Sequence, residues 1–228
     1  MQHATTKPYD LAATTRYFDR FGGLLHVPNR LDRAVYKEFI SVADLRNARH
    51  VFELGPGLGA LARSVLEYPS RVESWVLAEA STMLCRRLAS SLCRHDARGQ
   101  LFKVSDPPPF PFTAHCFDRV VSCFVLDCMD RETQREYLRE ARRLLMPGGT
   151  LCAMSVTRGT TIASTLVMGL GNVLARVSPG LALGALFIEL EPSFPPEDWD
   201  LLVNRVVTSM GFATRIIVAQ ARATPLDK

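Results

Sequence analysis

Three glycines interrupt an apolar stretch of this chain, and an acidic residue stands two positions before the first of them. Residues 51–66 read VFELGPGLGALARSVL, so Glu53 precedes Gly55 and Gly57. A glycine lacks a Cβ atom, so its backbone adopts positive φ and lets a ligand approach closely. The N–H groups at the start of a following helix attract an anion. The stretch therefore predicts a site for a nucleotide-like ligand.

Alternating apolar runs predict the elements that must hold this loop. Residues 51–54 read as a short buried strand, and apolar side chains between Leu58 and Leu66 recur at helical spacing. The same alternation continues downstream, which favours an α/β fold. We expect further strands at residues 75–79, 101–104, 117–127 and from 145, and helices at residues 9–21, 33–45, 81–92 and 130–145.

Two further carboxylates follow the next two expected strands. Glu79 ends the run 75–78 and lies 20 residues beyond Gly59. An acid at the tip of the second strand can accept hydrogen bonds from the hydroxyls of a ribose; the alternative is an exposed carboxylate at a strand end. Asp106 follows the third strand and opens the proline-rich segment DPPPFPF.

The ELGPGLG pattern resembles motif I of the class I S-adenosylmethionine-dependent methyltransferases. Two later blocks add to this resemblance: residues 117–126, FDRVVSCFVL, resemble the fourth strand of that family, and residues 145–151, LMPGGTL, its turn into strand five. The blocks occur in the family's order over residues 48–156. The resemblance implies a Rossmann-like, doubly wound, mostly parallel sheet with helices on both faces and an N-terminal helical cap.

The same resemblance implies S-adenosylmethionine as the cofactor and assigns candidate residues to its parts. The candidates are Glu53, Gly55 and Gly57 at the methionine end, Glu79 and Ala80 at the ribose, Asp106 and Pro107 at the adenine, and Cys123 and Phe124 beside the reacting centre. Tyr17 would close over the cofactor, as an aromatic of the N-terminal helix does in many family members. The alternative is that this aromatic residue only packs the helix onto the sheet.

Other ligand classes fit the sequence less well. A dinucleotide site usually reads G-x-G-x-x-G, whereas the third glycine here comes one position early, so a nicotinamide oxidoreductase is a distant alternative. Enzymes that methylate amino groups of nucleic acids place an aromatic after a Pro-Pro pair, and here Pro109 follows Asp106-Pro107-Pro108. The net charge of +4 comes without a Lys/Arg-rich run, so no nucleic-acid partner is expected.

The candidates for proton transfer are weaker than those for binding. Many small-molecule members of the family place histidines after strand four, where this chain has Asp127 and Cys128. Asp127 would orient or deprotonate a substrate, or it would cap the following helix. His26, in the loop between the N-terminal helices, would reach a substrate or stay solvated. Methyl transfer to a thiol, an amine or an acidic phenol needs little acid–base help, because alignment of the reactants supplies much of the acceleration.

Residues 159–188 contain a single charged residue, Arg176. Such an apolar stretch suits a lid over a small lipophilic acceptor, a peripheral contact with a membrane surface, or a buried helix pair. Enzymes of the ubiquinone/menaquinone-biosynthesis type are the closest analogy for such an acceptor. A methyltransferase-like protein that binds without turnover is the competing hypothesis. We see no signal peptide or membrane-spanning run and no C-x-x-C pair, so a cytoplasmic location is expected, with membrane association as an extension.

We expect one domain over residues 1–228. It would consist of a helical cap (1–48), a cofactor-binding core (49–156), an apolar lid or insert (157–194) and a C-terminal helix and strand (195–228). Pro195 and Pro196 would start the helix, with Trp199, Leu202, Val203, Val206 and Val207 on its apolar face. Residues 214–219 would form the strand. Members of the family usually end in two antiparallel strands, so either this hairpin is shortened or residues 186–190 supply one strand.

Overall fold

One seven-stranded sheet organises the protein, whose computed structural model describes residues 9–22, 30–157, 189–209 and 212–222. The strand order is β3-β2-β1-β4-β5-β7-β6. The first five strands are parallel: β1 His50–Leu54, β2 Ser74–Glu79, β3 Gly99–Lys103, β4 Phe117–Cys123 and β5 Leu145–Val156. The last two, β6 Trp199–Ser209 and β7 Phe212–Ala221, form an antiparallel hairpin on β5.

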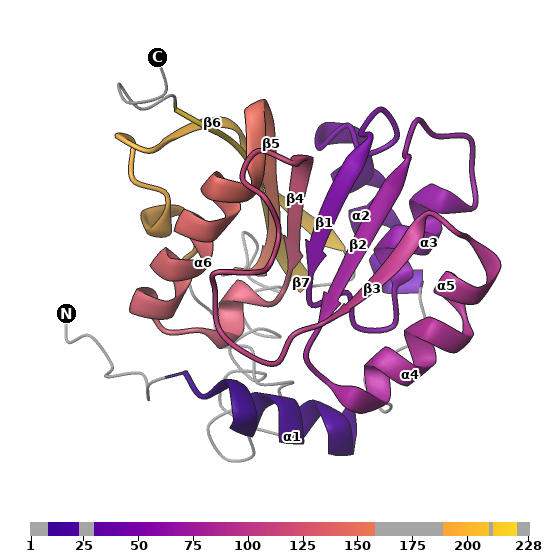
Figure 1. The fold of residues 1–228 in the computed structure, drawn as a ribbon. Coiled ribbons are helices and arrows are strands. Elements are labelled where there is room, and N and C mark those ends of the chain that lie inside the picture. The colour runs from indigo at the N-terminus through magenta and orange to yellow at the C-terminus, as the bar shows by residue number, and fades with distance from the viewer. Residues whose placement is uncertain (1–8, 23–29, 158–188, 210–211, 223–228) are drawn as a thin grey trace.

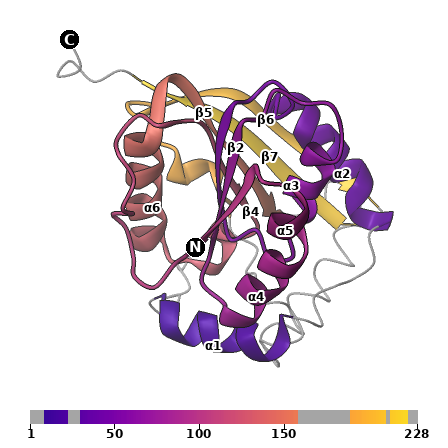
Figure 2. The same ribbon diagram turned by 45° about the vertical axis from the view of Figure 1, so that its right-hand side comes forward.

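Helices cover both faces of the sheet, as the resemblance implied (Figure 1). The α-helices are α1 Leu11–Phe21, α2 Arg30–Val42, α3 Ala60–Leu66, α4 Thr82–Ser90, α5 Leu92–His95 and α6 Arg131–Leu144; two 3₁₀ turns are η1 Leu126–Cys128 and η2 Glu191–Ser193. Helix α6 packs on one face, and α2, α3 and α4 pack on the other. Helix α1 lies across the end of the molecule where the parallel strands finish (Figures 1 and 2). The predicted doubly wound fold is confirmed. No helix in the described ranges is long and apolar enough to cross a membrane.

The strands are nearly continuous apolar runs because both of their faces are covered. Along β1, Phe52 and Leu54 join the core beneath α6, whereas Val51 joins the core beneath α2 and α3. Side chains alternate along a strand, so Glu53 points to the same face as Val51. On that face Trp75 of β2 is fully buried. This alternation decides which side chains reach the carboxyl edge of the sheet.

Local capping signals place the helices around that edge. Ser81 accepts a hydrogen bond from the backbone N–H of Leu84, and Asp130 accepts from the N–H groups of Glu132 and Thr133, so these two residues are the N-caps of α4 and α6. Helix α2 begins and ends three residues earlier than expected. Asp44 follows it with a left-handed φ of 51°, a conformation that does not continue a helix.

The prediction of a helix after Pro195 is wrong, because residues 199–209 form strand β6. The helical spacing of the apolar residues arises from a bulge: Leu201 pairs with Ala219 and Val203 pairs with Val218, which leaves Leu202 as an extra residue. β-Branched residues such as Val206 and Val207 favour the strand. Strand β6 completes the hairpin, so this hairpin is not shortened, and Leu190 precedes a 3₁₀ turn.

Two sets of expectations concern residues that the structure does not describe. One is the suggestion that His26 reaches a substrate. The other is the lid, the membrane contact or the buried helix pair, all of which depend on residues 158–188. The division of the chain into a cap, a core, an insert and a C-terminal part therefore stays a prediction.

Candidate functional site

The glycine-rich loop lies at the carboxyl edge of β1, beside the end of β2. Leu54 is the register partner of Ala78, and the backbone N–H of Gly55 donates to the carbonyl of Ala78 at 2.8 Å. Gly55 and Gly57 have φ of 62° and 59°. A side chain at either position would strain the backbone, because L-residues rarely adopt this conformation. The sequence therefore needs glycines here to turn the chain from β1 into α3.

The two glycines differ in what surrounds them. A Cβ atom on Gly55 would lie 2.4 Å from a methyl carbon of Val125, whereas a Cβ on Gly57 would meet nothing within 4 Å. Gly55→Ala should thus lower the free energy of unfolding by about 2 kcal/mol, through backbone strain and a clash with a stiff β-branched neighbour. Gly57→Ala should cost about 1 kcal/mol, from strain alone. Urea denaturation of both variants measures the difference, and equal losses would contradict the assigned contact.

Glu79, the last residue of β2, forms a hydrogen bond with the glycine-rich loop. Its Oε2 accepts a hydrogen bond from the backbone N–H of Gly57 at 3.2 Å, and its Oε1 accepts from the N–H of Ser81 at 2.8 Å. The side chain is buried. Burial raises the pKa of Glu79, and these N–H groups and Lys103 oppose that rise. The carboxylate therefore joins the glycine loop to the start of α4 and keeps lone pairs for a ligand.

A cleft opens above Glu79, between α1 and the carboxyl ends of the strands. It is lined by the glycine loop, by Ala78 to Ser81 of β2 and the turn after it, by Val104 after β3, and by Phe124, Val125, Cys128 and Met129 after β4. Apart from Glu79, the side chains here are mostly apolar. The cleft thus combines one buried carboxylate with an apolar wall.

Helix α1 covers this cleft with one face. Leu11, Thr14, Thr15 and Phe18 line it, at the i, i+3, i+4, i+7 spacing of one side of a helix. This face of α1 was not predicted from the sequence, although the spacing of the four residues could have indicated it. Tyr17 does not line the cleft, and the neighbouring Phe18, whose ring packs edge-on against Tyr17, lies where the aromatic residue was expected.

Carboxylates fasten α1 at both ends. Asp19, near its end, accepts hydrogen bonds from the Ser81 hydroxyl at 2.7 Å and from the Met83 N–H at 3.0 Å. At the other end, the backbone N–H of Tyr9 donates to Asp130 at 2.6 Å. Figure 2 shows the helix running from the side of α6 to the side of α4. The cap is therefore tied to the starts of two helices that flank the cleft.

The other two predicted carboxylates lie elsewhere. Glu53 is 2% exposed and accepts a hydrogen bond from Trp75 Nε1 at 2.8 Å, so it lies beneath the loop instead of lining the cleft. Burial raises its pKa to about 7. Asp106 and Pro107 are exposed and outside the cleft lining. Of the three acidic residues predicted to converge, Glu79 alone lines the cleft.

Asp127 has an unusual environment for a carboxylate. Its side chain is fully buried, its Oδ2 accepts from the backbone N–H of Val156 at 2.8 Å, and its Oδ1 has no hydrogen-bond partner among the described residues. Burial raises the pKa of Asp127 to about 8. The suggestion that it caps the following helix is wrong, because Asp130 is the cap of α6.

The residues after β4 bring Phe124, but not Cys123, to the cleft. Phe124 has a φ of 62°, which is uncommon for a residue with a side chain and marks a constrained turn at the site. Cys128 and Tyr137 also line the cleft and were not predicted. No group of three His, Cys, Asp or Glu side chains that could hold a metal ion occurs in the part of the chain that the structure describes.

Comparison with known proteins identifies the domain type. A family model described as "Methyltransferase domain" matches residues 51–149. The Highly reducing polyketide synthase ctvA of Aspergillus terreus is 32% identical over 111 residues, which cover 47% of this chain and 4% of that protein. The Fusarielin synthase FSL1 of Gibberella zeae is 27% identical over 169 residues, which cover 72% of this chain and 6% of that protein. The chain thus spans a small part of the length of these relatives.

Solved structures share the fold. The N-methyltransferase NodS from Bradyrhizobium japonicum, in complex with S-adenosyl-L-homocysteine, has a TM-score of 0.69 at 15% identity, covering 92% of this chain and 99% of that one. The magnesium protoporphyrin IX methyltransferase ChlM from Synechocystis, with the same bound ligand, has a TM-score of 0.66 at 13% identity, covering 94% and 100%. The family model thus identifies residues 51–149 as a methyltransferase domain, and these solved methyltransferases share the fold of the chain.

Proposed function

We propose that the chain binds S-adenosylmethionine in the cleft beneath α1 and transfers its methyl group to a small apolar acceptor. The observation that carries this proposal is the position of Glu79. Its buried carboxylate lies at the tip of β2, directly beside the N–H groups of the glycine loop. Such a carboxylate suits the paired hydroxyls of a ribose. The cofactor supplies a methyl group on a sulfonium, whose positive charge is lost on transfer.

The loop leaves room for the methionine part of the cofactor. The open space beside Gly57, where a Cβ would touch nothing, supports close approach of a ligand to the backbone. Gly55 and Ala80 border the same cleft. Glu53 lies below this space and supports it through Trp75, so we assign Glu53 a positioning role. The adenine role of Asp106 and Pro107 stays a prediction.

The apolar wall supports an apolar acceptor. The wall offers few hydrogen-bonding groups, because it is formed by Phe18, Phe124, Val125 and Met129. Such a wall favours an apolar molecule over a sugar or a nucleotide. One relative is a highly reducing polyketide synthase, which makes a polyketide-type acyl chain the first acceptor class to test. Transfer to such a carbon nucleophile would form the carbon–methyl bond and break the methyl–sulfur bond of the cofactor, and the acidic C–H proton of the acceptor would pass to a base in the solvent.

The decisive experiment has two steps. Calorimetric titration with S-adenosylmethionine and S-adenosylhomocysteine should show binding, and NADH should not bind. Turnover is then measured against β-ketoacyl thioesters, quinols, phenols and thiols, with S-adenosylhomocysteine as the measured product. Binding without turnover on any acceptor would favour a methyltransferase-like binding protein. Binding of NADH in place of S-adenosylhomocysteine would overturn the proposal.

The hydrogen bonds that hold α1 in place should affect the rate at which the proposed cofactor dissociates. Asp19→Ala removes the acceptor of two hydrogen bonds that tie α1 to α4, so S-adenosylhomocysteine should dissociate about fivefold faster. Stopped-flow fluorescence with excess competitor measures this rate. Asp200→Ala is the control, because Asp200 is another exposed aspartate. It lies on β6, away from α1, and forms an ion pair with Arg222. An unchanged rate in Asp19→Ala would show that α1 does not retain the ligand.

A further inference from the structure

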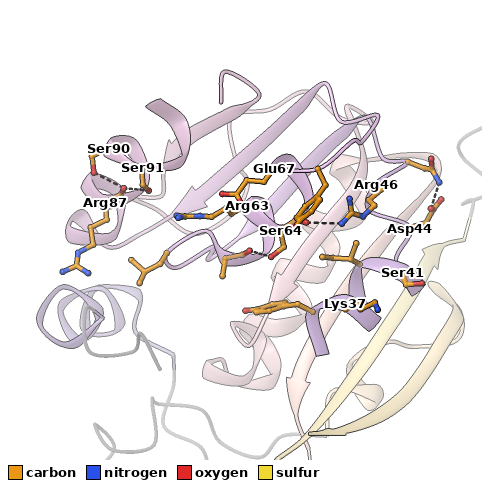
Figure 3. A pocket seen from close by; sticks show the side chains of 16 residues that line it. Lys37, Ser41, Asp44, Arg46, Arg63, Ser64, Glu67, Arg87, Ser90 and Ser91 are labelled. Carbon is orange, nitrogen blue, oxygen red and sulfur yellow. Dashed lines mark hydrogen bonds between the residues drawn. The ribbon is translucent and has the colours of Figure 1, made fainter. Parts of the chain in front are cut away.

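We infer that a second, basic groove between α2, α3 and α4 is a docking surface for an acidic region of a partner protein. The groove is much larger than the cofactor cleft, at about 1210 Å³, and shares no lining residue with it. Figure 3 shows cationic side chains distributed along it: Arg87 from α4, Arg63 from α3, Arg46 from the turn after α2, and Lys37 from α2.

The groove has an excess of positive charge that the described residues do not neutralise. Lys37, Arg63 and Arg87 have no carboxylate within ion-pair distance in the described ranges. Two acidic residues, Asp44 and Glu67, also line the groove. Asp44 already accepts a hydrogen bond from Asn47 at 2.7 Å and lies 3.8 Å from Arg119. The remaining charge attracts an anionic partner.

Arg46 is held in place before any partner binds. Its guanidinium lies 5.0 Å from the centroid of the Tyr68 ring, and one of its nitrogens donates to the carbonyl of Ser64 at 3.4 Å. The other guanidinium donors stay available. A planar guanidinium that is already ordered loses less entropy when it binds a carboxylate in a bidentate manner. Tyr68 is 57% exposed and adds an aromatic surface of the kind enriched at protein interfaces.

The hydroxyl groups of the groove are less available than its cations. The Ser64 hydroxyl donates to the carbonyl of Ala60, and the hydroxyls of Ser90 and Ser91 both donate to the carbonyl of Arg87. An occupant would therefore meet the guanidinium and ammonium groups more readily than the hydroxyls of Ser64, Ser90 and Ser91. Such groups bind carboxylates.

The shape and the mixed charge favour a protein over other polyanions. Asp44 and Glu67 would repel the evenly spaced phosphates of a nucleic acid, and a concave groove between helices does not match a flat membrane surface. A protein surface that is mostly acidic, with some basic residues, can pair with both signs of charge. The groove begins at Leu58 and Ala60, which flank the N-cap of α3, so an occupant would touch the far side of the glycine loop.

Binding of poly-L-glutamate, the probe for an acidic chain, tests this inference. The full chain is labelled and titrated in low salt, and the triple variant Lys37→Gln/Arg63→Gln/Arg87→Gln is compared with Arg94→Gln/Arg135→Gln/Arg139→Gln. Both triples remove the same charge, and the control positions, which are exposed, lie on α5 and α6. The groove triple should weaken binding about tenfold or more, and the control triple less than about threefold.

Three results would overturn the inference. The two triples could weaken poly-L-glutamate binding equally, or the wild-type chain could fail to bind poly-L-glutamate. The wild-type chain could also bind a short DNA duplex or anionic vesicles more tightly than poly-L-glutamate, with that binding abolished in the groove triple. Circular dichroism and S-adenosylhomocysteine titration of each variant report whether the fold and the cofactor cleft are intact. Loss of poly-glutamate binding with unchanged S-adenosylhomocysteine binding separates this surface from the proposed methyl transfer.

Discussion

Asp127→Asn is expected to make the protein more stable than the wild type at pH 8 by an amount on the order of 5 kcal/mol. Burial raises the pKa of Asp127 from 3.8 to about 8 in the folded protein. Between these values the folded state holds a proton that the unfolded state has released. The stabilisation is therefore complete below about pH 4 and is lost as pH rises toward 8, at about 1.4 kcal/mol per pH unit.

Asparagine removes this titration and keeps the shape of the side chain. Its amide oxygen can still accept from the Val156 N–H, as the protonated acid does. The two proteins should thus have similar stability at pH 4 and diverge above it. Urea denaturation at pH 4, 5, 6, 7 and 8, at constant ionic strength, measures the divergence.

Glu53 provides an internal control for this pH series. Its pKa rises from 4.5 to about 7 on burial, so it also lowers stability as pH rises, but only up to about pH 7. Asp127→Asn should keep this loss between pH 5 and 7 and show no loss between pH 7 and 8. Glu53→Gln should still lose stability between pH 7 and 8. A wild type and an Asp127→Asn variant with the same pH profile would refute the assignment.

Glu79→Gln is expected to weaken S-adenosylhomocysteine binding about 100-fold, because hydrogen bonds to a charged group contribute about 1.5–3 kcal/mol each. Both carboxylate oxygens of Glu79 already accept backbone N–H groups, from Gly57 and Ser81. A glutamine presents one NH₂ group, which would face one of these donors. The loop would shift, and the remaining lone pairs for the ribose hydroxyls would be lost.

Calorimetry at pH 7 measures this loss. Glu67→Gln is the matched control, since Glu67 is an exposed glutamate at the C-cap of α3 and outside the cleft. S-adenosylhomocysteine binding by this variant should stay within about twofold of the wild type. Thermal unfolding of Glu79→Gln without ligand shows how much of the effect comes from the loop. If Glu79→Gln binds S-adenosylhomocysteine as tightly as the wild type does, Glu79 does not bind the ribose.

The sequence was sufficient to predict the cofactor-binding half of the fold. Apolar runs and glycines are local signals, and they placed β1, the glycine loop, β2 with Glu79 and helix α6 correctly. Strand β6 was not, because its bulge at Leu202 produces helical spacing and its pairing with β7 is non-local. Local spacing cannot reveal a register shift between two strands.

The side-chain directions at the site were harder to predict than the elements. Glu53 ends a strand whose residues alternate between faces, and the partner that holds it on the far face, Trp75, lies 22 positions away. Whether a strand-end acid reaches the cleft depends on such a partner. Phe18 and Tyr17 are adjacent on a helix, so a shift of one residue decides which ring covers the site.

Helix α1 also bears on the rate of the proposed methyl transfer. Its hydrogen bonds at Tyr9 and Asp19 lie on either side of the cleft. If the cofactor binds beneath α1 as proposed, exchange of S-adenosylhomocysteine for S-adenosylmethionine would require at least one of them to open. Such an opening step would be independent of the acceptor, and where the chemical step is fast it would limit turnover.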